Sequence, residues 1–240
     1  MIFEDEQAEN SMLNGDFDIA IPFRVRVSEG GEPEVTVFPS QKKLAQEFLR
    51  KFRTPDEIFT SEAIEWVRER IAPYLLDYLF GIIDEGRDYF LNFRITSADD
   101  KLILPETRLI TRADELENLT GYDFDSMNEY GHICYGTVID GKIVSAACTN
   151  YPCDLTGEDG LVAEIGTETA GEYRGRGYAL SNCTALATAL LERDFEVLYE
   201  CEAHNDASVG LVKRLGGVEF AKNFCVVGCK LEDSEGGGTL

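Results

Sequence analysis

The sequence predicts a mixed α/β fold of the α+β type, because short strands and amphipathic helices alternate along the chain. In the second half, an alternating hairpin precedes a strand that runs into a loop rich in glycine and arginine, and this loop opens a helix. A further strand, a short helix and a closing strand follow. The 240 residues are 44% hydrophobic and 10% aromatic, which is enough for a sizeable core. We therefore expect one large domain or two small ones.

The first half of the chain is predicted to begin with a hairpin followed by two helices. Residues 1–15 are polar and acidic, so we expect them to be frayed. The strands and helices expected next span residues 18–27, 34–38, 40–52 and 61–82. Ser40 is the expected cap of the first helix, and Pro73 should bend the second.

The region before residue 112 contains no motif that points to chemistry. Strands are predicted over 90–95 and 101–110, and residues 111–115 should cap and open a short helix. We expect residues 1–111 to form an α/β packing partner, whose strand and helix order also permits a degenerate copy of the second half. Residues 112–231 are the predicted functional domain, and the acidic, glycine-rich residues 232–240 a disordered tail.

The second half has the more regular pattern. Its predicted strands and helices span residues 132–139, 143–149, 161–169, 177–193, 197–201, 206–215 and 219–229. The first two strands form a hairpin across Asp140-Gly141. Asn205 should cap the short helix, and Gly216-Gly217 should end it.

An anion site is predicted where the strand over 161–169 runs into the next helix. The loop there contains Arg174-Gly175-Arg176-Gly177-Tyr178-Ala179. Glycines let the backbone approach a phosphate, and the first N–H groups of a helix have no partner inside the helix. The loop lacks the lysine of the Walker pattern and the third glycine of the Rossmann fingerprint. We therefore expect a pyrophosphate-binding loop of another class.

The composition narrows the possible partners. The formal net charge of -23 would repel nucleic acid and anionic lipid, and it would favour an amine-bearing substrate. No apolar run is long enough to span a bilayer, and the acidic start Met1-Ile2-Phe3-Glu4-Asp5-Glu6 is unlike a secretory leader. The 7 cysteines lack CxxC spacing and only 2 histidines are present. We expect reduced thiols, a cytoplasmic location and no metal site.

These motifs resemble the GNAT superfamily of acetyl-CoA-dependent N-acetyltransferases. Its signature is Arg or Gln, two residues, Gly, one residue, then Gly or Ala, as in Arg174 to Ala179. A second family element follows the next strand, where Asn205-Asp206-Ala207-Ser208 opens a helix that ends at Leu215-Gly216. The resemblance covers about residues 112–230 and implies a mostly antiparallel sheet with flanking helices. The stretch Glu164 to Thr169 is similar to the branch that includes antibiotic-resistance acetyltransferases.

The resemblance implies acetyl-CoA as cosubstrate and direct attack of an amine on its thioester. The strand before the loop should splay from the next strand, with the pantetheine in the gap and the pyrophosphate on the loop N–H groups. The cofactor-binding residues implied are Thr167, Glu168, Thr169, Arg174, Gly175, Arg176, Gly177, Tyr178, Ala179, Asn205 and Ser208. Two of them have an alternative role, because Arg176 also fits a surface charge and Asn205 also fits a helix cap.

An amine attacks only when it is neutral, so a base or a water chain should take its proton. Glu164, near the middle of the strand beside the gap, is the leading candidate. Glu168 lies on the same face by the two-residue period and is the second candidate. Each carboxylate could instead simply point outward from the strand. Glu200 and Glu202 on the next strand are candidate amine binders.

A general acid should protonate the leaving thiolate. The family commonly uses a tyrosine in the helix after the asparagine, but here that position holds Val212. Tyr199 or His204 could replace it, although both also fit structural roles, or the thiolate could leave unassisted. Cys201 is expected to be a buried thiol and not a nucleophile, because nothing marks a base beside it.

Three functions remain open at the level of the sequence. The first is acetyl transfer to a primary amine of a small molecule. The second is a non-catalytic module that binds acyl-CoA, which the missing tyrosine motivates. The third is acetyl transfer to an amine of a peptide or protein. The acceptor, the length of the acyl chain and the oligomeric state are not encoded in any pattern we recognise.

Overall fold

The computed structural model describes residues 1–82, 88–111, 116–150 and 161–231. Its contacts divide the chain into two compact units, Met1–Leu91 with Ala221–Leu240, and Asn92–Phe220. This division differs from the boundary expected at residue 112, and the position of the functional boundary stays a prediction. The tail over 232–240 lies outside the described residues.

The first unit is built on a mixed sheet. Its strands are β1 (Ile2–Glu4), β3 (Glu34–Val37), β2 (Ile19–Ser28), the later part of β12 (Val218–Lys230), and β4 (Phe80–Ile82). They pair in the order β1-β3-β2-β12, and β4 also pairs with β12. The predicted hairpin is confirmed, because β2 and β3 are antiparallel from Phe23–Val37 to Arg26–Glu34.

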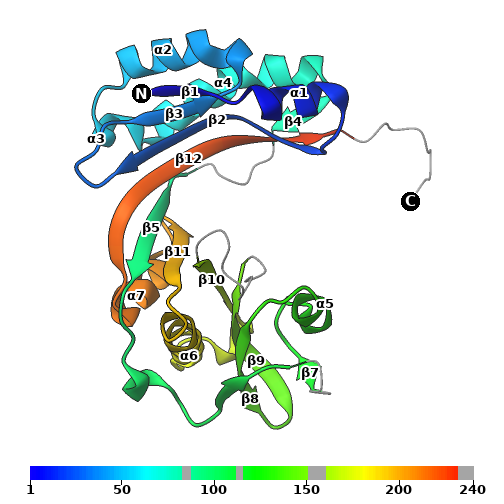
Figure 1. The fold of residues 1–240 in the computed structure, drawn as a ribbon, viewed down its shortest axis with the longest axis vertical. Helices are drawn as coiled ribbons and strands as arrows, with labels where there is room; N and C mark the ends of the chain where they lie inside the picture. Colours follow the sequence, from blue (N-terminus) through cyan, green and yellow to red (C-terminus); the bar gives the residue numbers. More distant parts are fainter. Residues whose placement is uncertain (83–87, 112–115, 151–160, 232–240) are drawn as a thin grey trace, which may run out of the picture. The chain divides into compact units, whose positions relative to one another are not determined.

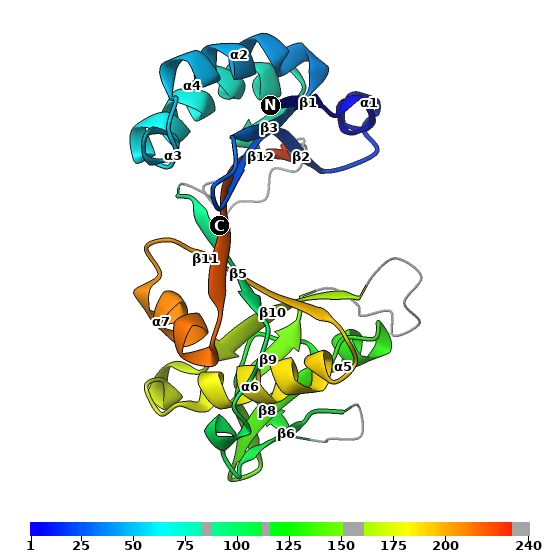
Figure 2. The same cartoon turned by 60° about the vertical axis from the view of Figure 1, so that its left-hand side comes forward.

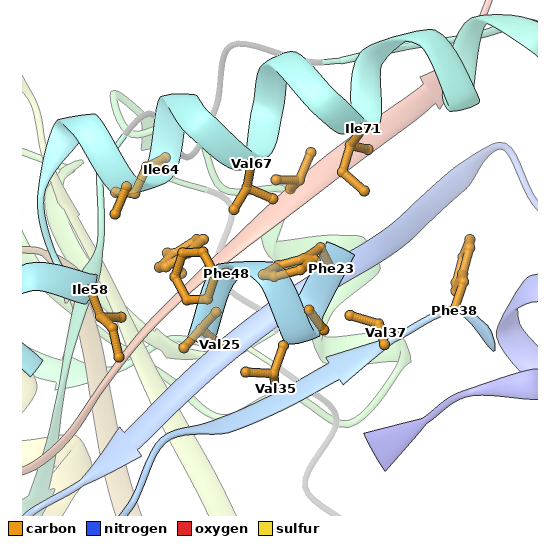
Figure 3. Packing of buried hydrophobic residues seen from close by; sticks show 14 of the residues in the cluster. Phe23, Val25, Val35, Val37, Phe38, Phe48, Ile58, Ile64, Val67 and Ile71 are labelled. Carbon is orange, nitrogen blue, oxygen red and sulfur yellow. The ribbon is translucent and has the colours of Figure 1, made fainter. Parts of the chain in front are cut away.

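Helices cover one face of this sheet (Figure 1). They are α1 (Glu6–Asn14), α2 (Lys42–Lys51), α3 (Pro55–Ile58) and α4 (Ser61–Asp77). Figure 3 shows side chains from β2, β3, α2 and α4 meeting in one apolar layer. Phe48 lies at its centre, with its ring 5.5 Å from that of Phe23 and 6.0 Å from that of Phe224. Burial of these aromatic surfaces is the main driving force for folding of this unit.

Three expectations for the first unit were wrong. Residues 1–15 are ordered as β1 and α1, because the Asp5 side chain caps the helix and Met12 is buried against the sheet. The helix expected to reach residue 82 ends at Asp77, since Leu79 has a left-handed φ of 63° and the chain then enters β4. Ser40 does not cap α2, because it lies within the short 3-10 turn Pro39–Gln41.

The second unit contains the sheet that the second half of the sequence predicts. Its strands pair in the order β5 (Phe90–Ile95), β11 (Glu196–Glu202), β10 (Val162–Thr169), β9 (Lys142–Thr149), β8 (Cys134–Ile139) and β6 (Thr107–Leu109), and β7 (Glu117–Asn118) pairs with β9. The pairs β6–β8, β8–β9 and β9–β10 are antiparallel, whereas β10–β11 is parallel. The strand expected over 101–110 is reduced to β6, and most of the helix start expected at 111–115 lies outside the described residues.

Three helices flank the strands of the second unit. They are α5 (Phe124–Glu129), α6 (Tyr178–Leu191) and α7 (Asp206–Leu215). Figures 1 and 2 show α5 and α6 on opposite faces of β8, β9 and β10. The cap of α7 is confirmed, because the Asn205 side chain accepts a hydrogen bond from the Ser208 N–H at 3.1 Å, and Gly216 ends the helix with a φ of 94°.

Replacement of Phe48 by alanine should destabilise the first unit by about 3–5 kcal/mol, because the ring is fully buried among other aromatic rings. Trp66 is the only tryptophan, and its ring lies 6.2 Å from Phe48, so denaturant unfolding followed by its fluorescence reports on this core. Leu76→Ala in α4 is the control, because Leu76 is 56% exposed and should change stability by less than about 0.5 kcal/mol. Equal effects of both variants would contradict this description of the core.

Candidate functional site

Strands β10 and β11 are paired only where they begin. Their parallel register runs from Val162–Glu196 to Glu164–Leu198. After Glu164, β10 stays paired with β9 as far as Thr169–Ser145, while β11 continues to Glu202 without pairing with β10. The carboxyl ends of the two strands therefore separate, which is the splay that the family resemblance implied.

A cavity of about 580 Å³ lies at these separated strand ends, between the loop before α6 and the start of α7. Residues from both signature elements share its wall. Of the residues predicted to bind the cofactor, Thr167, Glu168, Thr169, Arg174, Gly175, Gly177, Tyr178, Ala179, Asn205 and Ser208 line it. The structure thus brings together two motifs that are more than two dozen positions apart in the sequence.

Along β10, the backbone N–H and C=O groups of successive residues point alternately toward β9 and toward the cavity side. The Glu164 carbonyl accepts from the Asn150 N–H at 2.8 Å, and the Ala170 N–H donates to the Val144 carbonyl at 3.0 Å, so even-numbered residues direct their backbone toward β9. Thr167 and Thr169 therefore direct theirs to the opposite side, where β11 has left. Glu168 directs its backbone to β9.

The loop before α6 has the geometry of an anion cradle. Gly175 and Gly177 have left-handed φ angles of 74° and 85°, and a Cβ built on either glycine would have no heavy atom within 4 Å. Gly177 is the N-cap of α6, so the first N–H groups of this 14-residue helix lack partners within the helix. Phosphate oxygens bind well to such groups.

The two arginines of the loop differ in position. The Arg174 Nε donates to the Thr169 carbonyl at 3.0 Å, and Arg174 lines the cavity. The Arg176 guanidinium lies 5.2 Å from the centre of the Tyr173 ring and donates to the Glu172 carbonyl at 3.0 Å. Arg176 is not part of the cavity wall, which favours the surface-charge alternative for its side chain.

Helix α7 forms one wall of the cavity. The sequence analysis predicted only the residues of its first turn, Asn205 and Ser208, as part of the site. Ala207, Gly210, Leu211 and Arg214 line the cavity, and their three- and four-residue spacing places them on one helix face. Val212, at the usual tyrosine position, is fully buried and does not line the cavity. A glycine inside a helix costs about 1 kcal/mol relative to alanine. A Cβ on Gly210 would meet no heavy atom within 4 Å, so packing inside the protein does not require this glycine.

Glu164 lies beside the site without lining the cavity. Its carboxylate accepts a hydrogen bond from the Asn150 amide at 2.5 Å. Burial raises the pKa of Glu164 above the ordinary value, and the nearby Glu200 adds to this increase, whereas the bond from Asn150 opposes it. A carboxylate with a raised pKa is suited to accept a proton near neutral pH.

Glu168 has a structural partner. Its carboxylate accepts a hydrogen bond from the Gly121 N–H at 2.9 Å, which fastens the segment before α5 to the face of β10. The same face carries Gly166, where a Cβ would lie 2.2 Å from the Asn150 amide oxygen and 3.1 Å from the Tyr122 hydroxyl. The absent side chain at Gly166 is therefore what lets Asn150 approach Glu164.

Tyr199, on β11, lines the cavity together with residues of the loop before α6. Its hydroxyl lies 2.8 Å from the Ser208 hydroxyl, so β11 and α7 meet at this pair. Burial raises the pKa of Tyr199, and the phenol is therefore protonated throughout the neutral range. His204 is paired with Glu202 at 3.4 Å and does not line the cavity. Burial also raises the pKa of Cys201, as expected for an unreactive thiol.

A buried polar network that the sequence did not reveal holds α6 against the sheet. The Asn182 amide donates to the Ser145 hydroxyl at 3.1 Å, and its oxygen accepts from Thr137 at 2.9 Å. Ser145 in turn lies 2.7 Å from the Thr169 hydroxyl at the end of β10. The network links the helix that carries the loop to the strand that leads into it. The only signal in the sequence is an asparagine inside an apolar helix.

Among the described residues, no group of three or more histidine, cysteine, aspartate or glutamate side chains is arranged to hold a metal ion. The helices that the structure describes also include none that is both long enough and apolar enough to cross a membrane. The described cysteines, among them Cys134, Cys148 and Cys183, are free thiols.

Comparison with known proteins identifies the enzyme family to which this chain belongs. The sequence model of the GNAT acetyltransferase family matches residues 28–224. The chain therefore belongs to the GNAT acetyltransferase family, and it has the fold and enzyme class that its two motifs implied. The match also includes much of the region before residue 112, where no motif was found. No curated protein matches the chain.

Solved structures that match this chain at low sequence identity include the following three. A GCN5-related N-acetyltransferase-like protein from Streptococcus suis is 21% identical, with 65% of this chain and 66% of that chain covered and a TM-score of 0.45. A GCN5-related N-acetyltransferase from Kribbella flavida is 15% identical over 77% of each chain, with a TM-score of 0.41. A GNAT-family acetyltransferase from Colwellia psychrerythraea is 12% identical, covering 90% of this chain and 89% of that chain, with a TM-score of 0.41.

Glu164→Gln should make the protein more stable at neutral pH than the parent. Because the folded pKa of Glu164 is raised, the folded state holds the proton more tightly, and the carboxylate costs stability once the pH rises above the unfolded pKa. The gain in stability should vanish at pH values below the pKa that Glu164 has in the unfolded state. It should grow as the pH rises through the pKa of Glu164 in the folded state. Denaturant midpoints measured from pH 4 to pH 8 would show this trend.

Glu168→Gln is the matched control for this stability measurement. It removes the same charge from the same face of β10, but the Glu168 carboxylate is exposed and is stabilised by the Gly121 N–H. This variant should show no gain at neutral pH. A gain in the Glu168 variant, or none in the Glu164 variant, would contradict the assigned environments.

Proposed function

We propose that this protein transfers an acetyl group from acetyl-CoA to a primary amine of a small molecule by direct attack. The observation that carries the proposal is the cavity at the separated ends of β10 and β11, whose wall contains both family signature elements. When bound, acetyl-CoA supplies an activated thioester carbon that a neutral amine can attack. Free thiols throughout the described chain fit a reducing, cytoplasmic setting.

The residues of the cavity fit this donor. The bare backbone at Gly175 and Gly177 leaves space for a pyrophosphate at the start of α6. Thr167 and Thr169 offer backbone groups on the side from which β11 has separated, where an amide-containing pantetheine arm could add its hydrogen bonds. Asn205 and Ser208 hold the facing helix end in place.

Glu164 is the proposed proton acceptor for the attacking amine. Its raised pKa favours proton uptake, and Asn150 fixes its orientation. Glu200 and Glu202 follow Leu198, the partner of Glu164, at two-residue spacing on β11. By strand alternation they share the face of Glu164, so we assign them to binding of a positively charged acceptor.

Tyr199 is the proposed proton donor to the leaving sulfur. We assign it the role of the tyrosine that the family commonly carries at the position of Val212, because Tyr199 lines the cavity and Val212 does not. Ser208 orients the phenol at 2.8 Å. The raised pKa of Tyr199 keeps the proton available at neutral pH.

Gly177→Asp should weaken acetyl-CoA binding and lower turnover at least about tenfold, because a carboxylate would occupy the proposed phosphate cradle. The test is calorimetric titration with acetyl-CoA together with detection of released thiol over a panel of amines. Gly141→Asp is the matched control, since Gly141 has a similar φ of 77° and open surroundings but lies in the β8–β9 turn. The control should keep the affinity and rate of the parent, and equal losses in both variants would argue against the cradle.

Glu164→Gln should lower kcat about a hundredfold and should remove the acid limb that the carboxyl contributes to the pH profile of kcat/KM. Activity of the parent should rise with pH through the raised pKa of Glu164, since only the carboxylate can accept the proton. Tyr199→Phe should lower kcat about tenfold while leaving that acid limb in place. Steady-state rates from pH 5 to pH 9 distinguish the two roles.

Glu168→Gln serves again as the control for the kinetic measurement. A larger loss of kcat in this variant than in Glu164→Gln would transfer the base role to Glu168. Binding of acetyl-CoA by the parent without thiol release over a broad amine panel would favour the alternative of a non-catalytic acyl-CoA module. Turnover with peptides alone would favour a peptide acceptor.

A further inference from the structure

The last pair of residues between β8 and β9 departs from a regular antiparallel ladder. The Thr149 N–H donates to the Ile133 carbonyl at 3.0 Å, so a regular pair would return a bond from the Ile133 N–H to the Thr149 carbonyl. The Ile133 N–H instead donates to the Thr149 hydroxyl at 3.2 Å. The Thr149 carbonyl is thereby left to another donor, the ring of His132, whose Nδ1 lies 2.6 Å from the carbonyl oxygen.

This contact determines which ring nitrogen of His132 carries the hydrogen. A carbonyl oxygen only accepts hydrogen bonds, so the Nδ1–H of His132 is the donor. Nδ1 stays a donor when the ring is protonated, so the bond persists over the pH range in which histidine titrates. The backbone N–H of His132 donates to the Met127 carbonyl of α5 at 2.9 Å. His132 therefore fastens the end of β9 to an element that is itself held in place.

The residue after Thr149 is the one that binds the Glu164 side chain. The Asn150 N–H donates to the Glu164 carbonyl at 2.8 Å, and the Asn150 amide donates to the Glu164 carboxylate at 2.5 Å. Asn150 is exposed, so packing does not select its rotamer, and holding it in one orientation costs side-chain entropy. Its orientation therefore depends on the main chain at Thr149, where the bond from His132 is made.

We propose that His132 is a positioning residue for the proposed base, because its bond to the Thr149 carbonyl holds Asn150 in the orientation that donates to Glu164. His132 acts through the main chain of Thr149. The effect on catalysis rests on the proposed function, in which Glu164 accepts the proton of the amine. The bond from Asn150 stabilises the charged carboxylate, so removal of His132 should raise the pKa of Glu164 further above its ordinary value.

The other titratable groups around Glu164 are kept in every variant of His132. They are Glu200 and Glu202 from β11, Glu168 from the same strand, Tyr122 from the segment before α5, and Cys148 from β9. Burial raises the pKa of Tyr122, and the bond to Cys134 together with burial raises that of Cys148, so both are uncharged near neutral pH. The charged neighbours in this set are therefore carboxylates, and none of them is altered.

The test measures the pKa of Glu164 directly, by carbon NMR of labelled glutamate carboxyl groups in the full chain. The resonance is assigned from its loss in Glu164→Gln. His132→Leu should raise this pKa, whereas His132→Asn should keep that of the parent, because its amide can place a donor where Nδ1 lies. An unchanged pKa in His132→Leu, or an equal rise in His132→Asn, overturns the inference. The readout needs no substrate, so it does not depend on the proposed function.

Gly166→Ala tests the same orientation from the other side and keeps the inference testable if loss of His132 unfolds the chain. A Cβ on Gly166 would clash with the Asn150 amide oxygen, so this variant should displace Asn150 and raise the pKa of Glu164. Combining Gly166→Ala with His132→Leu should raise the pKa no further than either change alone, since both act through Asn150. Additive rises, or no rise in Gly166→Ala, overturn the shared route.

Steady-state kinetics connect the position of Asn150 to turnover. At the acid end of the pH profile, kcat/KM of His132→Leu should be about fivefold below that of the parent, as expected for loss of one hydrogen bond. At the alkaline plateau the two should agree. An equal loss at every pH would indicate a merely structural role and overturn the inference. If Glu164→Gln keeps the acid limb, the proposed base is wrong, and the NMR measurement still decides whether His132 positions Asn150.

Discussion

The early separation of β10 from β11 is the constraint on which the site depends. Three residue pairs join the strands, and β10 then remains paired with β9 alone. This arrangement directs the backbone of Thr167 and Thr169 to a side with no neighbouring strand, where a ligand can take the place of β11. Asn182 stabilises it, because its buried amide ties α6 through Ser145 to the end of β10. An unpaired buried amide would be costly, so this network also fixes where α6 begins.

The two faces of β10 have different neighbours, and the proposed function gives them different roles. One face, with Glu164, Gly166 and Glu168, lies under the segment before α5, and Asn150 and Gly121 hold its carboxylates. Thr167, Glu168 and Thr169, at the end of the strand, meet the cavity bounded by α6 and α7. In the proposed function, Glu164 would take up the proton on one face, and the donor would lie along the strand edge from which β11 has separated. Partial burial of the Glu164 carboxylate on its face of the strand raises the pKa of this group.

Helix α7 shows how a departure from a family pattern can be compensated in space. Val212 packs into the interior, so the usual tyrosine position does not face the cavity in this chain. A different tyrosine, Tyr199 on β11, brings a hydroxyl to the same wall beside Ser208. Gly210 and Arg214 instead lie on the face of the helix that lines the cavity. Among the described residues, nothing lies within 4 Å of a Cβ built on Gly210, and no hydrogen bond or ion pair is formed by the Arg214 guanidinium.

The sequence by itself determined the strands and helices from residue 132 onward, the loop at Gly175 and Gly177, the Asn205 cap and the family, but it missed α5 (Phe124–Glu129). These features depend on local rules of periodicity, glycine conformation and capping, which act over a few residues. The first half was predicted less well, because burial against distant strands ordered residues 1–15 and a left-handed Leu79 ended α4 early. Only the tertiary structure decided that Glu164 is the partly buried carboxylate beside Asn150, and that Tyr199 and Arg214 join the cavity wall. Those outcomes depend on contacts between residues far apart in the chain, and desolvation and packing at such contacts have no local signature.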